Sequence, residues 1–126
     1  MSERDVSESS VFFYRLVGAE ELRLIEASGF RAFPPRFEHQ PIFYPVVQEA
    51  YAHEIAKRWN ANHSTSGGVG YVTRFRIESA YLSKYPVQAV GGKSREEYWV
   101  PADELAEFNS HIIGSIEVVA RYEREP

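Results

Sequence analysis

Two adjacent carboxylates, Glu96 and Glu97, stand where a glycine-containing turn leads into an apolar segment, Glu96-Glu97-Tyr98-Trp99-Val100-Pro101. Neighbouring side chains of an extended strand point to opposite faces, so only one carboxylate can face a given cleft. The same alternation places Trp99 on the face of Glu97. A carboxylate fixed at a strand start can do acid–base or electrostatic work. It can equally belong to a solvated strand edge, and both interpretations stay open at this point.

Arg15 is a second candidate for chemistry, because it interrupts a strand-like run, residues 11–17, that is otherwise apolar. A guanidinium in such a strand needs a partner, since an unpaired buried charge is costly. One interpretation is a structural salt bridge to Glu21 or to a carboxylate on a neighbouring strand. The other is a bidentate clamp for a phosphate- or ribose-bearing ligand, for which Arg is better suited than Lys.

Metal and thiol chemistry are not favoured by the sequence. The histidines show neither the i, i+4 spacing of a helical metal site nor a recognisable set of carboxylate partners (His39, His53, His63 and His111). Cysteine is absent, which excludes disulfides, thiolate zinc sites and a cysteine nucleophile. The sequence therefore predicts no metal site.

The elements that must position Arg15 and Glu97 follow from hydrophobic periodicity and from turn residues. Strands are predicted over 11–17, 41–44, 69–77, 87–90, 96–100 and 112–122, and helices over 19–28, 46–59 and 102–109. Gly29 is expected to end the first helix. This order fits an α+β domain with a largely antiparallel sheet better than a doubly wound parallel sheet. Residues 1–10 are predicted to be a disordered arm, 11–122 a single domain and 123–126 a tail.

Composition narrows the class of protein. The 126 residues are 44% apolar and 14% aromatic, which is typical of one globular domain. A net charge of -4 gives no basic footprint for nucleic acid. No apolar run approaches about 18 residues and the N-terminus is polar and acidic, so neither a membrane span nor a signal peptide is predicted. A cytoplasmic location is the expectation.

Five short motifs follow one another along the chain: Phe13-Tyr14-Arg15; Ile42-Phe43-Tyr44 leading into Glu49-Ala50-Tyr51-Ala52; Tyr71-Val72-Thr73-Arg74-Phe75-Arg76-Ile77; Ala80-Tyr81-Leu82-Ser83; and Glu96-Glu97-Tyr98-Trp99-Val100-Pro101. In order and spacing, over about residues 11–119, they resemble the ADP-ribosyltransferase fold. The chain is also similar to small bacterial proteins that carry an ADP-ribosylation-related label with no assigned target. The resemblance implies a mainly antiparallel split sheet with two to three helices.

The resemblance also implies a substrate, NAD, and a role for five residues. In that family an Arg or His on the first strand contacts the NAD ribose or phosphates, and Arg15 matches it. A carboxylate at the start of a late strand is catalytic, and Glu97 matches that position. Tyr14, Phe43 and Tyr44 are the aromatic side chains expected to stack on the flat nicotinamide ring or to line its site.

The chemistry of such a reaction explains the need for a carboxylate. Breaking the bond between ribose and the cationic nicotinamide builds positive, oxocarbenium-like charge on the sugar, as in glycoside hydrolysis. A fixed carboxylate facing that charge stabilises the transition state more than the ground state. The implied function is therefore cleavage of the nicotinamide–ribose bond, with transfer of ADP-ribose to an unknown acceptor, a protein among the possibilities, or to water.

The chain departs from the family pattern at two places. Phe43-Tyr44-Pro45 stands where Ser-Thr-Ser or a lone Tyr is usual, which leaves Tyr44 as the only candidate there. Arg95 stands where an acceptor-orienting Glu or Gln is usual. One alternative is therefore an inactive module of the same fold that binds a nucleotide-like ligand or a protein partner. Another is purely structural: a solvated edge at Glu96 and Glu97, and an ion pair at Arg15.

Overall fold

The computed structural model describes residues 10–35, 40–62, 69–89, 92 and 95–123, with only the backbone described for 59–62. Its strands are β1 (Ser10–Gly18), β2 (Ile42–Phe43), β3 (Val69–Glu78), β4 (Val87–Ala89), β5 (Glu96–Tyr98), β6 (Val100–Pro101) and β7 (Ile112–Glu123). Its helices are α2 (Ala19–Ala27), α3 (Glu49–Asn62), α4 (Ser79–Leu82) and α5 (Leu105–Ser110), the last preceded by the 3-10 turn η1 (Ala102–Glu104). The strands pair antiparallel, which confirms the predicted α+β class.

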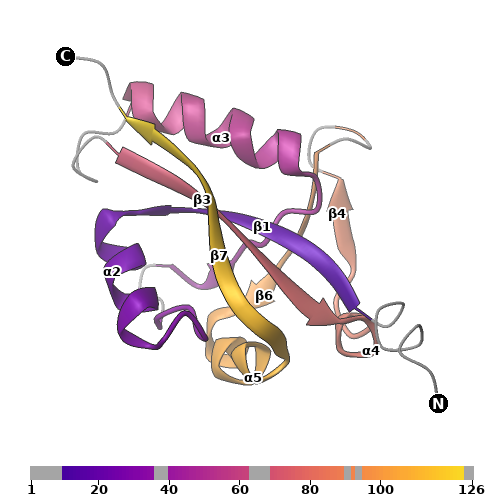
Figure 1. Ribbon diagram of the computed structural model, residues 1–126. Helices are drawn as coiled ribbons and strands as arrows, with labels where there is room; N and C mark the ends of the chain where they lie inside the picture. Colours follow the sequence, from indigo (N-terminus) through magenta and orange to yellow (C-terminus); the bar gives the residue numbers. More distant parts are fainter. Residues whose placement is uncertain (1–9, 36–39, 63–68, 90–91, 93–94, 124–126) are drawn as a thin grey trace.

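A three-stranded sheet in the order β1-β3-β7 lies at the centre (Figure 1). β1 pairs with β3 along its whole length, from Ser10 opposite Glu78 to Gly18 opposite Gly70. On the other edge of β1, Tyr14 forms a bridge with Val46, in which each backbone N–H donates to the other residue's carbonyl, at 3.0 and 2.8 Å. This bridge connects the central sheet to a second ladder.

The second ladder holds Glu97 in place from both sides. Segments 42–47 and 96–101 run antiparallel in a single register, with Ile42 opposite Pro101 at one end and Val46 opposite Glu97 at the other. On the far side of β5, β4 places Gln88 opposite Glu97. The backbone of Glu97 is therefore fixed between two neighbouring segments.

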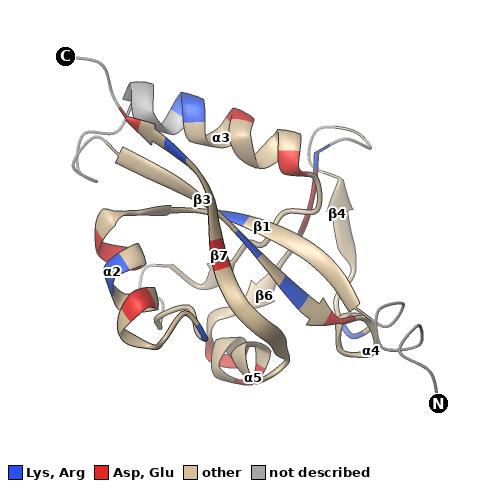
Figure 2. Ribbon diagram, in the orientation of Figure 1, with Lys and Arg blue, Asp and Glu red and all other residues tan. Residues whose placement is uncertain are grey.

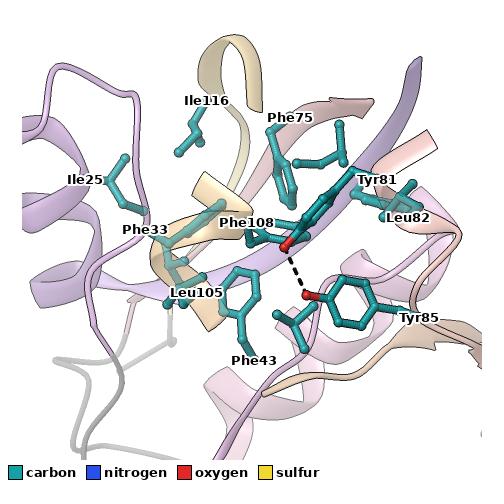
Figure 3. Packing of buried hydrophobic residues seen from close by; sticks show 14 residues of the cluster. Ile25, Phe33, Phe43, Phe75, Tyr81, Leu82, Tyr85, Leu105, Phe108 and Ile116 are labelled. Atoms are coloured by element: carbon teal, nitrogen blue, oxygen red, sulfur yellow. Dashed lines mark hydrogen bonds between the residues drawn. The ribbon is translucent and has the colours of Figure 1, made fainter. Parts of the chain in front are cut away.

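Helices pack on both faces of the central sheet. Successive side chains of β1 point to opposite faces, so they belong to two separate clusters. On one face α3 packs Tyr51 and Ile55 against Leu16 and Val72. The opposite face carries the larger core, to which α2 and α5 contribute (Figure 3). Its buried members are Phe13, Val17, Ile25, Phe33, Phe43, Phe75, Ile77, Tyr81, Leu82, Tyr85, Val100, Leu105, Phe108 and Ile116. Several of the aromatic rings meet at tilted or edge-on angles, the arrangement that aromatic pairs favour.

Gly29 ends α2 as predicted. Its φ of 79° is left-handed, and its N–H donates to the Glu26 carbonyl at 2.9 Å while the Phe30 N–H donates to Ile25 at 3.0 Å. These two bonds form the Schellman motif, which satisfies carbonyls that the helix end leaves free. Phe30, also at positive φ, then accepts a bond from the Ile116 N–H at 2.7 Å. The helix end is thereby attached to β7.

Several boundaries differ from the predicted ones. α3 begins at Glu49 rather than at residue 46, because the backbones of Val46 and Val47 are engaged by Tyr14 and Glu96 in the second ladder. The strand predicted over 96–100 is two short strands, and a one-turn helix, α4, lies between the strands predicted over 69–77 and 87–90. The described chain therefore holds four α-helices where two to three were expected.

The ends of the chain lie largely outside the described residues. Of the predicted arm, only Ser10 is described, and it is the first residue of β1. Of the predicted tail, only Glu123 is described, and it is the last residue of β7. The helix predicted over 46–59 ends at Trp59, of which only the backbone is described.

Tyr85 supports a first prediction, because its buried hydroxyl donates to Glu104 Oε1 at 2.5 Å and lies 3.0 Å from the Tyr81 hydroxyl (Figure 3). Burial, followed by the hydrogen bond to Glu104, raises the pKa of Tyr85 well above its usual 10. We expect Tyr85→Phe to lower the free energy of unfolding at pH 7 by about 1–3 kcal/mol, since the hydrogen bonds of this hydroxyl with Glu104 and Tyr81 are both lost. Urea unfolding measures this change.

The effect of Tyr85→Phe is expected to depend on pH. A group whose pKa is higher in the folded state than in the unfolded state stabilises the fold. This contribution to the free energy of unfolding is complete below the unfolded-state pKa and is lost as pH rises above the unfolded-state pKa. The difference between wild type and Tyr85→Phe should therefore shrink as pH rises above about 10. Tyr44→Phe, which alters an exposed ring, is the control. A difference that stays constant to high pH would contradict the assignment.

Candidate functional site

A cavity of about 400 Å³ opens beside the edge of β1 that carries the Tyr14–Val46 bridge. Its walls come from separate parts of the chain: Arg15 of β1, Glu21 of α2, Tyr44, Ile55 of α3 and Glu97 of β5. A volume of this size lies within the range of small-molecule sites in proteins. The cavity is therefore the candidate functional site.

Three of the five residues assigned from the sequence line this cavity, and two do not. Arg15, Tyr44 and Glu97 lie in its wall although they are far apart in the chain. Tyr14 is half-buried and packs on the α3 side of the sheet, because it alternates with Arg15 along β1. Phe43 is 0% exposed and packs between the rings of Phe33 and Phe108 in the core. The expectation that Phe43 stacks on a ligand is corrected, since its ring offers no free surface.

Arg15 is held by both a carboxylate and an aromatic ring. Its Nη2 lies 3.0 Å from Glu21 Oε2, and its Nε donates to the same oxygen at 3.3 Å. Its guanidinium carbon lies 4.7 Å from the centre of the Phe43 ring. Gly18 leads β1 directly into α2, so Glu21 in the first helical turn can reach back to β1. The structural ion pair considered from the sequence is present, and Arg15 lines the cavity as well.

Glu97 is fixed by two hydrogen-bond donors rather than lying on an open edge. Its Oε1 accepts a bond from Trp99 Nε1 at 2.9 Å, and its Oε2 accepts one from the Tyr51 hydroxyl at 3.1 Å. The Trp99 bond confirms that these two side chains share a face, as strand alternation predicted. Burial, then the charge of Glu97, raises the pKa of Tyr51, so its hydroxyl stays protonated and donates. The carboxylate of Glu97 therefore has a defined orientation.

Sequence reasoning missed Tyr51 as a partner of Glu97. Tyr51 and Ile55 stand four residues apart in the helix predicted over 46–59, and this spacing indicates only that Tyr51 faces inward from its helix. That it meets a residue of β5 depends on how α3 crosses the second ladder, which no local pattern contains. The alternation of side chains along the strand was the signal available for Trp99.

The neighbours of Glu97 turn away from the cavity. Glu96 and Gln48 form two hydrogen bonds. Gln48 Nε2 donates to Glu96 Oε1 at 2.7 Å, and the backbone N–H of Glu96 donates to Gln48 Oε1 at 2.9 Å. Arg95 donates to both carboxylate oxygens of Glu54 on α3, at 3.0 and 2.8 Å. Both contacts attach the start of β5 to the beginning of α3.

Tyr44 is the exposed aromatic residue of the cavity wall. The residue is 40% exposed, and its ring meets that of Trp99, another exposed residue, edge-on with centroids 6.2 Å apart. Exposed rings beside a cavity can contact a flat ligand. Trp99 also bonds to Glu97, so a ring bound here would lie close to the carboxylate.

The charges of the cavity favour a ligand that carries or develops positive charge. Arg15 and Glu21 compensate each other, which leaves the charge of Glu97 unbalanced among these three groups. In a partly enclosed site such a charge acts more strongly than in water. Among the described residues no group of three or more His, Asp or Glu side chains is placed to hold a metal ion.

No protein-family model and no curated protein sequence matches the chain. None of the helices within the described ranges is long and apolar enough to cross a membrane. Inference about function therefore rests on the geometry of the cavity.

Proposed function

We propose that the cavity binds NAD and that the protein is an ADP-ribosyltransferase-like enzyme, which cleaves the nicotinamide–ribose bond and transfers ADP-ribose to an unassigned acceptor or to water. The observation that supports this most directly is the meeting of Arg15, Tyr44 and Glu97 in one cavity wall. The resemblance described from the sequence requires these three residues at one site, and they come from segments with no local connection.

The role of Glu97 follows from the charge that develops in the reaction. The glycosidic C–N bond breaks, its electron pair goes to the nicotinamide nitrogen, and the ribose carbon becomes positively charged. Glu97 then stabilises that charge, while water or an acceptor hydroxyl, amine or amide attacks the carbon and loses a proton. Because Tyr51 and Trp99 already orient the carboxylate, little reorganisation is needed as the charge develops.

The other two residues bind the parts of NAD on either side of the reacting ribose, the phosphates and the nicotinamide. Arg15 is suited to the phosphates, because a guanidinium binds oxyanions in a bidentate manner. Tyr44, exposed beside Trp99, is suited to the nicotinamide ring. A ligand phosphate at Arg15 competes with Glu21, which holds the guanidinium in the free protein.

That competition supports a second candidate function. In a module that binds a ligand without turnover, the Arg15–Glu21 pair is a structural element, and ligand recognition depends on Tyr44 and the cavity walls. The position of Arg95, which is paired with Glu54 rather than free to orient an acceptor, is consistent with this second candidate.

Titration with NAD tests both candidates. We expect saturable binding at or below about 1 mM NAD, the upper end of usual KM values, together with release of nicotinamide. The indole N–H of Trp99 is a direct NMR reporter, because it donates to Glu97 and should shift as the ligand binds. Binding without nicotinamide release would favour the module. Absence of binding would contradict NAD as the ligand of either candidate.

A further inference from the structure

A second hollow, of about 210 Å³, lies on the half of the sheet face that α3 leaves uncovered. α3 packs over Leu16 and Val72, and further along the same face Arg74 and Arg76 of β3 follow at intervals of two residues. Figure 2 shows basic positions on the half of β3 that lies away from α3. The residues of this hollow are different from those of the cavity that holds Glu97.

The two arginines share an exposed ring. Phe12 is 48% exposed and lies directly opposite Arg76 in the β1–β3 ladder. The guanidinium carbons of Arg74 and Arg76 lie 5.2 and 5.8 Å from the centre of the Phe12 ring. Contact of this kind attracts a cation to the ring face. Both guanidinium groups are therefore held at the hollow before any ligand arrives.

The guanidinium group of Arg76 has a donor, Nε, without a hydrogen-bond acceptor among the described residues. Arg74 is paired, with its Nε and Nη2 donating to Glu117 Oε1 at 2.9 and 2.7 Å. Arg76 has no carboxylate partner within the part of the chain that the structure describes, and its buried Nε has no hydrogen-bond acceptor there. A buried charged donor without an acceptor is costly. Two guanidinium groups and one carboxylate also leave this hollow with one net positive charge.

An irregularity in β7 shapes the opposite wall. The register changes from Arg74 opposite Glu117 to Arg76 opposite Ile113, which leaves extra residues on β7. Gly114 has a φ of 76° with no atom near the position of a Cβ, and Ser115 beside it is exposed. Such bulges often redirect side chains next to binding sites. Here Gly114 and Ser115 of the bulge line the hollow together with Arg76.

We propose that this hollow binds an oxyanion, a phosphate monoester or a carboxylate, carried on a small apolar group. Arg76 binds the oxygens, the Ser115 hydroxyl is a second donor, and Arg74 adds positive potential. Phe12 and Ile113 contact the apolar part of the ligand. At about 30 Å³ per water-sized group, the hollow holds several heavy atoms, which fits one oxyanion and a small apolar group. This site is independent of the proposed NAD reaction.

Three probes of similar size test the site on the full chain: phenylphosphate, benzoate and neutral benzyl alcohol. We expect the Nε–H NMR signal of Arg76 to shift saturably with at least one anionic probe, because an oxyanion bound at the outer edge of this guanidinium changes the electronic environment of the whole group. Stronger binding of phenylphosphate assigns the site to phosphate monoesters, and stronger binding of benzoate assigns it to carboxylates. If neither anion binds, or if benzyl alcohol binds as tightly, the proposal is wrong.

Matched variants locate the binding. Arg76→Gln should weaken the preferred anion by at least about tenfold, since a charge-assisted bond is lost. Arg76→Lys, which keeps the charge but not the planar fork, should give a smaller loss. Arg121→Gln removes the same charge elsewhere on the sheet, beside Glu123 and Tyr71, and should leave the affinity unchanged. An equal loss of affinity in Arg121→Gln would show a general charge effect and overturn the assignment. NMR spectra of each variant check that it is folded.

Discussion

Replacing Glu97 by Gln is expected to reduce nicotinamide release from NAD by at least about 100-fold, the usual cost of removing one preorganised group that stabilises transition-state charge. The amide has the size of the carboxylate, and its oxygen can still accept a bond from Tyr51 or Trp99. What disappears is the negative charge that, in the proposed NAD complex, faces the ribose. Because this charge matters most in the transition state, kcat should fall much more than KM changes.

Glu96→Gln is the matched control for that experiment. Glu96 is the adjacent residue and undergoes the same chemical change, but its carboxylate contacts Gln48 and does not line the cavity. We expect its turnover to equal that of wild type. Nicotinamide is quantified by chromatography at saturating and subsaturating NAD, and thermal unfolding checks the fold of both variants. Wild-type turnover in Glu97→Gln would refute the role of Glu97, as would an equal loss in both variants.

The features that the sequence predicted well are those governed by local geometry. Strand alternation separated Glu97 from Glu96, because a period of two residues is a property of any extended strand. Gly29 ended α2 as predicted, because a left-handed residue is the usual end of a helix. Neither inference needed knowledge of the tertiary fold.

The features that the sequence did not predict depend on long-range contacts. Val46 and Val47 continue a helical pattern, but hydrogen bonds to Tyr14 and Glu96 hold them in the second ladder instead. Such tertiary context overrides helix propensity, which is a weak preference. The bond between Tyr51 and Glu97 joins residues 46 positions apart, and nothing in either local segment indicates it.

Phe43 and Tyr44 illustrate the same limit at the site itself. Alternation says that they point to opposite faces, but it does not say which ring is buried. The pairing of β2 with β6 decides this, since it turns Phe43 toward Phe33 and Phe108 and leaves Tyr44 at the cavity. The sequence assigned both rings to the ligand, and the structure assigns one of them to the core.

Arg15 has two proposed roles. Its ion pair with Glu21 suggests a structural role, and its place in the cavity wall suggests a role in ligand binding. The side chains of Arg15 and Glu21 are 11% and 22% exposed, so the charge of each is balanced mainly by the other rather than by water. We expect Arg15→Met and Glu21→Leu each to lower the free energy of unfolding by about 2–4 kcal/mol, since each leaves one largely buried charge unpaired. The double variant should recover most of that loss, because both charges are then gone.

The double variant separates structure from ligand binding. If Arg15 binds the phosphates of NAD, Arg15→Met/Glu21→Leu should be stable and yet lose NAD affinity by at least about tenfold, the effect of one charge-assisted contact. The same double change at the exposed pair Arg23 and Glu20, 64% and 69% exposed, is the control and should alter neither Tm nor NAD affinity. Unchanged NAD affinity in the Arg15→Met/Glu21→Leu protein would show that this pair is only structural. Recognition would then depend on Tyr44, Glu97 and the walls between them.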